Sequence, residues 1–201
     1  MAVTTQQIKE LREVTGAGIM DCRKALEQSD GDFDKAVEYL REKAQETIAK
    51  RADRETSEGM IELYSHGNGR VGVMVEVNCE TDFVARSDSF RNLAHELALQ
   101  VAASAPLYIR AEDIPAEVLE VEKEQARKSA LEEGKPEKII ERIVEGKLNK
   151  YLDETCLLRQ PYVRDDEITV EQLLMQNIAS IGENVVIRRF ARWELGESEQ
   201  E

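Results

Sequence analysis

Residues 59–78 read GMIELYSHGNGRVGVMVEVN, two runs rich in Val, Ile and Met on either side of His66-Gly67-Asn68-Gly69. Asn-Gly is a strong signal for a β-hairpin, because both positions tolerate a positive φ. The alternating pattern therefore predicts two antiparallel strands joined by a tight turn. A third strand is predicted far downstream, at 185–193 (VVIRRFARW).

Helical patterns lie on both sides of this hairpin in the sequence. The first 45 residues contain three short amphipathic segments, the clearest of which has Phe33, Ala36, Val37 and Leu40 at helical spacing. After the hairpin we expect a helix capped by Ser87, a charged helical hairpin at 113–152 and a helix from Thr169. Strands and helices do not alternate, which disfavours a doubly wound nucleotide-binding sheet.

The predicted fold class is therefore α+β. We expect a three-helix bundle at 1–45, a linker or helical extension at 46–58 and an α+β core at 59–201. The core would contain an antiparallel sheet of at least three strands, packed with helices and including the helical hairpin.

Composition argues for a folded protein that does not bind nucleic acid directly. The chain has 201 residues, 41% of them hydrophobic, and a formal net charge of −14. Such a charge repels phosphate backbones and anionic membranes unless basic residues cluster. Residues 1–54 hold 10 basic and 11 acidic residues (net −1), and residues 55–201 hold 17 and 30 (net −13), so two modules are indicated.

The sequence offers little chemistry for an enzyme. Its three cysteines are widely spaced, no Cys/His cluster has zinc-ligand spacing, and Gly16-Ala17-Gly18 lacks the Lys-Ser/Thr of a phosphate loop. We expect no catalytic residue, metal or cofactor. The polar start, the short apolar runs and the cysteine usage favour a cytoplasmic protein without a signal peptide or membrane span.

One predicted loop, at 80–86 (ETDFVAR), places the apolar pair Phe83-Val84 between charged residues. Either residue could pack under the following helix as a hydrophobic staple. Alternatively, the aromatic side chain is exposed and anchors a partner protein. The residues alone leave both interpretations open.

Two long strings resemble the signatures of the elongation factor Ts family, and the resemblance covers nearly the whole chain. The first is LREVTGAGIMDCRKAL at 11–26, and the second is EVNCETDFVA at 76–85. Shorter stretches at 134–136, 144–147, 160–163 and 169–174 resemble the family in the same order. Ile19, Arg23 and Glu80 stand where Met, Lys and Gln are common.

The resemblance implies a guanine nucleotide exchange factor for the GTPase elongation factor Tu. Its N-terminal helices would form a unit similar to ubiquitin-associated domains that docks on the GTPase through Arg12, Ile19, Met20 and Lys24. The loop Thr81, Asp82, Phe83 and Val84 would insert near the magnesium site, with Phe83 as a wedge and Asp82 as its polar companion. Short members of the family pair through the core, so a homodimer is expected.

Two other functions remain as alternatives. The first is a binding adaptor, in which the N-terminal helices recognise a ubiquitin-like or other protein surface. The second is a GTPase activator that inserts an arginine, for which Arg86 is the nearest candidate.

Overall fold

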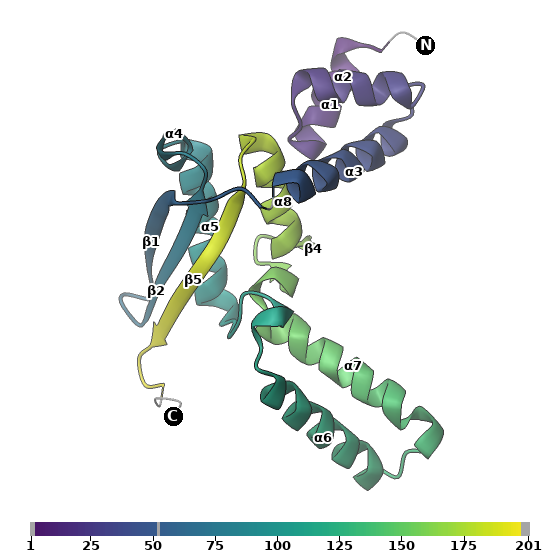
Figure 1. The fold of residues 1–201 in the computed structure, drawn as a ribbon, viewed down its shortest axis with the longest axis vertical. Helices are drawn as coiled ribbons and strands as arrows, with labels where there is room; N and C mark the ends of the chain where they lie inside the picture. Colours follow the sequence, from purple (N-terminus) through teal and green to yellow (C-terminus); the bar gives the residue numbers. More distant parts are fainter. Residues whose placement is uncertain (1–2, 52, 198–201) are drawn as a thin grey trace. The chain divides into compact units, whose positions relative to one another are not determined.

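The computed structural model describes residues 3–51 and 53–197 of the chain. It divides into two compact units, which are described separately below. One contains residues 1–98 together with 172–201, and the other contains residues 99–171. Figure 1 labels the elements along the chain.

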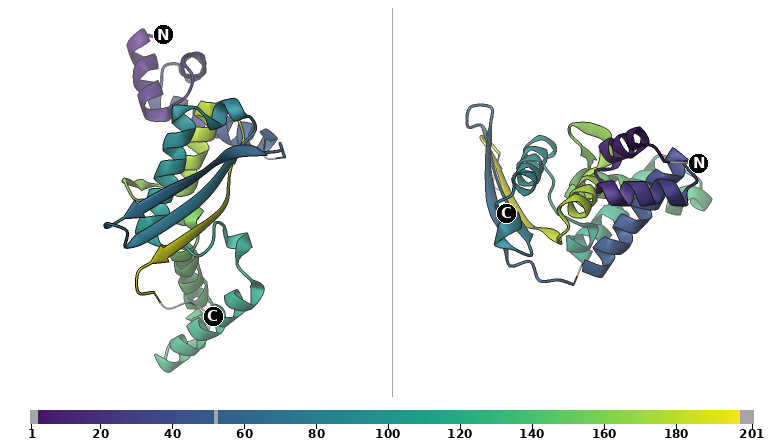
Figure 2. Two further views of the ribbon diagram at one scale, coloured as in Figure 1. Left: turned by 90° about the vertical axis from the view of Figure 1, so that its left-hand side faces the viewer. Right: turned by 90° about the horizontal axis from the view of Figure 1, so that it is seen from above.

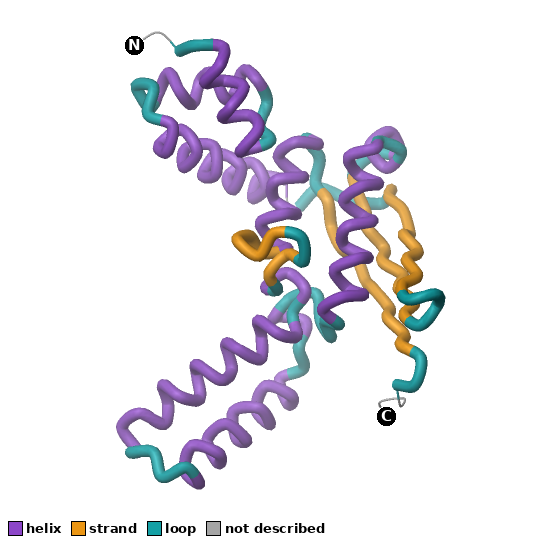
Figure 3. Tube along the Cα trace, turned by 180° about the vertical axis from the view of Figure 1, so that it is seen from behind, coloured by secondary structure: helices purple, strands orange, loops and turns teal. Residues whose placement is uncertain are grey.

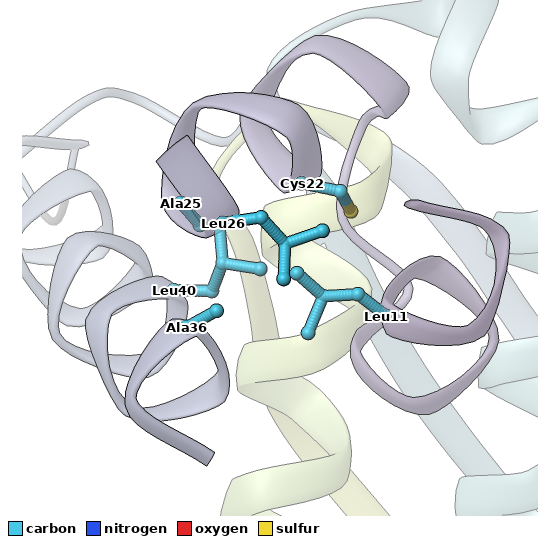
Figure 4. Packing of buried hydrophobic residues seen from close by; sticks show 6 residues of the cluster. All are labelled: Leu11, Cys22, Ala25, Leu26, Ala36 and Leu40. Carbon is cyan, nitrogen blue, oxygen red and sulfur yellow. The ribbon is translucent and has the colours of Figure 1, made fainter. Parts of the chain in front are cut away.

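The N-terminal part of the first unit is a bundle of three helices, α1 (Thr5–Thr15), α2 (Ile19–Gln28) and α3 (Phe33–Arg51). Thr4 caps α1 in a reciprocal capping box with Gln7, and Gly16 ends it at a φ of +66°. Six buried side chains from the three helices form the small core shown in Figure 4, namely Leu11, Cys22, Ala25, Leu26, Ala36 and Leu40.

The first unit also contains an antiparallel sheet in the order β1-β2-β5. The strands are β1 (Glu58–His66), β2 (Val71–Cys79) and β5 (Val185–Glu194). The distant third strand therefore pairs with β2 and makes it the central strand. In β2 the residues alternate, so that Val71, Val73, Val75, Val77 and Cys79 are buried on one face of the sheet.

Helix α5 (Asp88–Ser104) lies along one face of this sheet (Figures 2 and 3). Its buried residues Phe90, Leu93, Ala94 and Leu97 recur at helical spacing. Helix α8 (Val170–Ile181) follows on the far side of α5 from the sheet, as the end-on view in Figure 2 shows. No described helix of the first unit lies against the opposite face of the sheet (Figure 2).

The second unit is built around an antiparallel pair of helices, α6 (Ala116–Glu132) and α7 (Glu137–Thr155). Small and branched side chains meet along their seam, and the buried ones are Ala126, Ala130, Ile140 and Val144. The rest consists of two 3₁₀ turns and a small ribbon: η1 (Ala111–Asp113), η2 (Leu157–Arg159), β3 (Pro161–Tyr162) and β4 (Asp165–Thr169).

Two buried glutamines fix the chain where the hairpin joins the rest of the second unit. Gln100 donates to the carbonyl of Pro161 (3.1 Å) and accepts from the amide of Val163 (2.8 Å). Gln160 donates to the carbonyls of Ser104 and Glu154. Buried amides with such partners specify one packing arrangement, because leaving any of these groups unpaired costs free energy.

The predicted α+β class is confirmed, including the N-terminal helices, the three-stranded sheet and the helical hairpin. Helix α3 continues to Arg51, which fits the alternative of a helical extension after residue 45. Other details differ from the expectation, since a ribbon at 161–169 was not predicted. In place of a loop before α5, the chain forms the one-turn helix α4 (Asp82–Ala85).

Candidate functional site

The one-turn helix α4 follows directly after the central strand and is held by caps at both ends. Thr81 precedes it in an extended conformation, and its hydroxyl accepts the amide of Val84 (3.3 Å). The Ser87 hydroxyl donates to the carbonyl of Val84 (2.8 Å) and accepts the amide of Phe90 (3.3 Å). Ser87 therefore caps α5 as expected and closes the end of α4.

The two apolar residues of this turn have opposite environments. Val84 is 9% exposed and forms part of the core, whereas Phe83 is 83% exposed. One residue is thus buried, as a staple requires, and the other is exposed, as an anchor requires, because adjacent side chains on a helical turn point in different directions. Val84 anchors the turn, and Phe83 is the most exposed large apolar side chain of the described chain.

The charged residues of α4 lie on its surface. The carboxylate of Asp82 forms an ion pair with Arg86 at 3.0 Å, and both side chains are mostly exposed. Such an exposed pair contributes little to stability. Arg86 is therefore paired within its own turn.

The N-terminal residues singled out in the sequence lie on the surface of the bundle. Ile19 is 55% exposed and Met20 is 72% exposed, although they begin a helix whose other apolar residues are buried. Arg12 and Lys24 are exposed as well. Val14, three residues after the buried Leu11, is 62% exposed, and the neighbouring Thr15 is half-buried instead.

Val14, Ile19 and Met20 thus bring three exposed apolar side chains to the region where α1 ends and α2 begins. The sequence alone did not identify Val14 as a contact residue. Val14 and Thr15 lie three and four positions after Leu11, so helical spacing allows either of them to pack beside it. Thr15 takes the half-buried position, with its hydroxyl donating to the Leu11 carbonyl (2.6 Å), and Val14 faces solvent.

Within the described residues, no group of His, Cys, Asp and Glu is arranged to hold a metal ion. The histidines have local partners: His95 lies 2.9 Å from a carboxylate oxygen of Glu62, and His66 lies 3.1 Å from the hydroxyl of Tyr64. Among the residues that the structure describes, no helix is both long enough and apolar enough to span a membrane.

Comparisons with known proteins agree on one family. The family model described as "Elongation factor TS" matches residues 2–197. A curated elongation factor Ts from Caldanaerobacter subterraneus is 57% identical over 97% of this chain and 98% of its own length. Those from Carboxydothermus hydrogenoformans and Moorella thermoacetica are both 54% identical over 97% of this chain, covering 90% and 96% of the relatives.

The match spans both of the strings that suggested this family and the described elements from α1 to β5. The chain belongs to the elongation factor Ts family, whose members are nucleotide exchange factors for elongation factor Tu and not enzymes.

Proposed function

We propose that this chain binds elongation factor Tu in its GDP form and promotes GDP release by inserting the turn Thr81–Val84, displacing the magnesium ion. The observation that carries this proposal is Phe83, an aromatic side chain that is 83% exposed on a turn whose neighbouring residues are anchored. An exposed aromatic on a rigid support loses little conformational entropy on binding. It can therefore act as a wedge between elements of the GTPase.

The energetics of exchange are within reach of a few such contacts. A protein that lowers the affinity of its partner for a nucleotide by ~10⁴-fold needs about 5.5 kcal/mol of differential binding. A single buried aromatic anchor contributes about 2–4 kcal/mol at an interface. By linkage, bound GDP weakens the binding of the exchange factor by the same factor. No catalytic side chain is required.

Asp82 is the polar companion of Phe83 in this proposal. Its carboxylate is exposed and pairs with the exposed Arg86, so it can approach a partner without breaking a buried contact. One carboxylate provides too few ligands for a stable magnesium site. In this proposal, Asp82 competes with the magnesium ion for the groups of the GTPase that surround it. Asp82 does not hold the metal itself.

The N-terminal bundle provides the second contact, through Arg12, Ile19, Met20 and Lys24. Ile19 and Met20 expose a contiguous apolar pair at the start of α2, with basic side chains nearby in sequence. An apolar centre with a charged rim is typical of a protein-binding surface. This surface would provide docking affinity, and the turn at Phe83 would provide the coupling to GDP.

The experiment that tests this function measures the release of fluorescently labelled GDP from elongation factor Tu. We expect the wild-type chain to accelerate release and Phe83→Ala to lose at least about tenfold of that acceleration, which corresponds to ~1.4 kcal/mol of lost coupling. Phe83 is solvent-exposed, so its truncation leaves the fold of the free chain intact. The matched control is Leu131→Ala, another exposed apolar residue, located at the end of α6.

The outcomes separate the alternatives. A wild-type chain that does not accelerate release contradicts the exchange function. Equal acceleration by Phe83→Ala contradicts the wedge. Accelerated GTP hydrolysis that is lost in Arg86→Ala would favour the GTPase activator. Stable binding of another protein without any effect on GDP release would favour the adaptor.

We also propose that the chain forms a cytoplasmic homodimer through the uncovered face of its sheet. Part of this face is apolar across the strands: Leu63 lies opposite Met74, and Met74 lies opposite Ala191. Leu63 is 69% exposed, Ile61 58% and Trp193 61%. An apolar patch of this kind is unusual on a monomer, and two copies related by a two-fold axis would cover it with the same face.

A further inference from the structure

A four-residue helix is not stable alone, so contacts from elsewhere in the chain must hold α4 in place. Part of the support is local and comes from the caps at Thr81 and Ser87. Burial of Val84 anchors the turn as well, and further contacts come from the turn between α8 and β5, about a hundred residues downstream. They converge on Thr81, two positions before Phe83.

Glu183 binds Thr81 with both of its carboxylate oxygens. One accepts the backbone amide of Thr81 at 3.0 Å, and the other accepts its hydroxyl at 2.7 Å. The same hydroxyl accepts the amide of Val84. The carboxylate therefore orients the Thr81 hydroxyl so that a lone pair of the hydroxyl oxygen faces α4. It also places a negative charge at the N-terminal end of α4, where backbone amides lack helical partners.

The carbonyl of Thr81 is held as well. It accepts the amide of Ala85 at 3.2 Å and the thiol of Cys79 at 3.2 Å. The amide, hydroxyl and carbonyl of Thr81 thus all have partners within the protein, although the residue lies on the surface. This is an unusually complete set of contacts for the residue that begins an exposed turn.

Neighbouring residues fix the backbone on both sides of Glu183. Gly182 ends α8 at a φ of +86°, which turns the chain toward β5. The next amide, that of Asn184, donates to the side chain of Glu80 at 2.7 Å. Glu80 also pairs with Arg54 at 3.1 Å, and the Asn184 side chain donates to the carbonyl of Arg54 at 3.3 Å.

We propose that Glu183 is a positioning residue for nucleotide exchange, which holds the turn that carries Phe83 in its inserting conformation before the GTPase arrives. This inference rests on the proposed exchange function. Glu183 acts through Thr81 and Phe83 and makes no contact with the nucleotide. Preorganisation of this kind removes an ordering cost that would otherwise reduce the coupling between insertion and GDP release.

The test measures labelled-GDP release at increasing concentrations of the full chain. For Glu183→Ala we expect the maximal rate to fall roughly tenfold, because small displacements of an inserting group have large effects on rate. The half-saturating concentration should change less than about twofold, since the N-terminal docking residues are untouched. Thr81→Val should act like Glu183→Ala, and Thr81→Ser, which keeps the hydroxyl, should retain more of the rate than Thr81→Val. Glu167→Ala, an exposed glutamate in β4, is the matched control.

A double-mutant cycle shows whether Glu183 acts through the wedge. In the Phe83→Ala background, Glu183→Ala should lower the rate by less than about twofold, because there is no wedge left to position. A full tenfold further loss would overturn the proposal, as would a wild-type rate for Glu183→Ala alone. Both results assume that wild type accelerates release and that Phe83→Ala reduces this acceleration, and a failure at that step contradicts the exchange function instead.

A measurement on the free chain checks the same proposal without the GTPase. The amides of Val84 and Ala85 should exchange with deuterium faster in Glu183→Ala than in wild type, while amides in the centre of β2 keep their protection. Unchanged protection at α4 would show that Glu183 does not hold the turn. Loss of protection in β2 as well would show a general structural role and would likewise overturn the proposal.

Discussion

Single residues of this chain carry distinct tasks at the end of the central strand. Cys79 is buried, and its thiol donates to the carbonyl of Thr81, next to the turn that presents Phe83. Burial, together with the nearby negative charge of Glu183, raises the pKa of this thiol to about 11. Burial also raises the pKa of Cys22 and Cys156. At neutral pH the thiolate of Cys79 is therefore a very small fraction.

We predict that the native protein reacts with Ellman's reagent at least about 100-fold more slowly than the same protein in denaturant, where three thiols become available. Only the thiolate attacks the reagent, and burial limits both its population and its accessibility. The variant Cys79→Ser identifies the contribution of the site next to α4. Rapid reaction of one thiol in wild type that disappears in this variant would show that the end of β2 opens frequently.

Among the elements, the pairing of β1 with β2 depends on one glycine. Gly59 has a φ of +150°, and a Cβ built there would lie 2.1 Å from the backbone carbonyl oxygen of Val77. Backbone cannot move away as a flexible side chain can, so any larger residue displaces the strand. Gly146, in the interior of α7, has open space around its Cα and helical geometry.

We predict that Gly59→Ala lowers the free energy of unfolding by about 2–4 kcal/mol, from strain and lost pairing. The matched control, Gly146→Ala, should raise it by about 0.5–1 kcal/mol, because alanine is the better helix former. Chemical denaturation followed by circular dichroism measures both values. Equal stability of Gly59→Ala and wild type would contradict the close approach of β1 to β2.

Local patterns determined the elements that could be predicted from the sequence. The Asn-Gly turn and its alternating flanks identify β1 and β2, and the helical stripes identify α5 to α7, because in these segments burial follows a simple period. The one-turn helix α4 could not be predicted in this way. It depends on Glu183, which is distant in the sequence, and on the burial of Val84 beneath an exposed Phe83.

The candidate site, too, could be predicted from the sequence only in part. The family resemblance implied the roles of Thr81, Asp82, Phe83 and Val84, but the residue pattern alone left the exposure of Phe83 open, since a hydrophobic staple has the same sequence. Spacing alone also gave no sign that Ile19 is exposed, because it shares the spacing of the buried residues of α2. A periodic pattern shows which residues share one face of a helix. It does not show whether the residue at the end of that face is buried by the rest of the protein.

At the scale of the whole molecule, the distribution of charge bears on how two copies could meet. The chain carries −14, so two copies repel each other unless a neutral surface brings them together. The uncovered face of the sheet is such a surface. The same face carries an ion pair between Glu76 and Arg189 at 2.7 Å. The opposite charges of these two groups cancel, so the pair adds no net charge to the face.

We therefore predict that light scattering of the free protein gives the mass of two chains, and that Leu63→Glu gives the mass of one. A glutamate at this position would place two desolvated charges in an isologous interface, a cost of several kcal/mol. Leu63 is 69% exposed in a single chain, so the monomeric variant should keep its circular dichroism spectrum.

The matched control is Leu131→Glu, the same substitution at a residue that is 53% exposed at the end of α6, and it should remain dimeric. A wild-type mass of one chain at tens of micromolar would contradict the dimer. Dissociation by Leu131→Glu and not by Leu63→Glu would move the interface from the sheet to the helical hairpin.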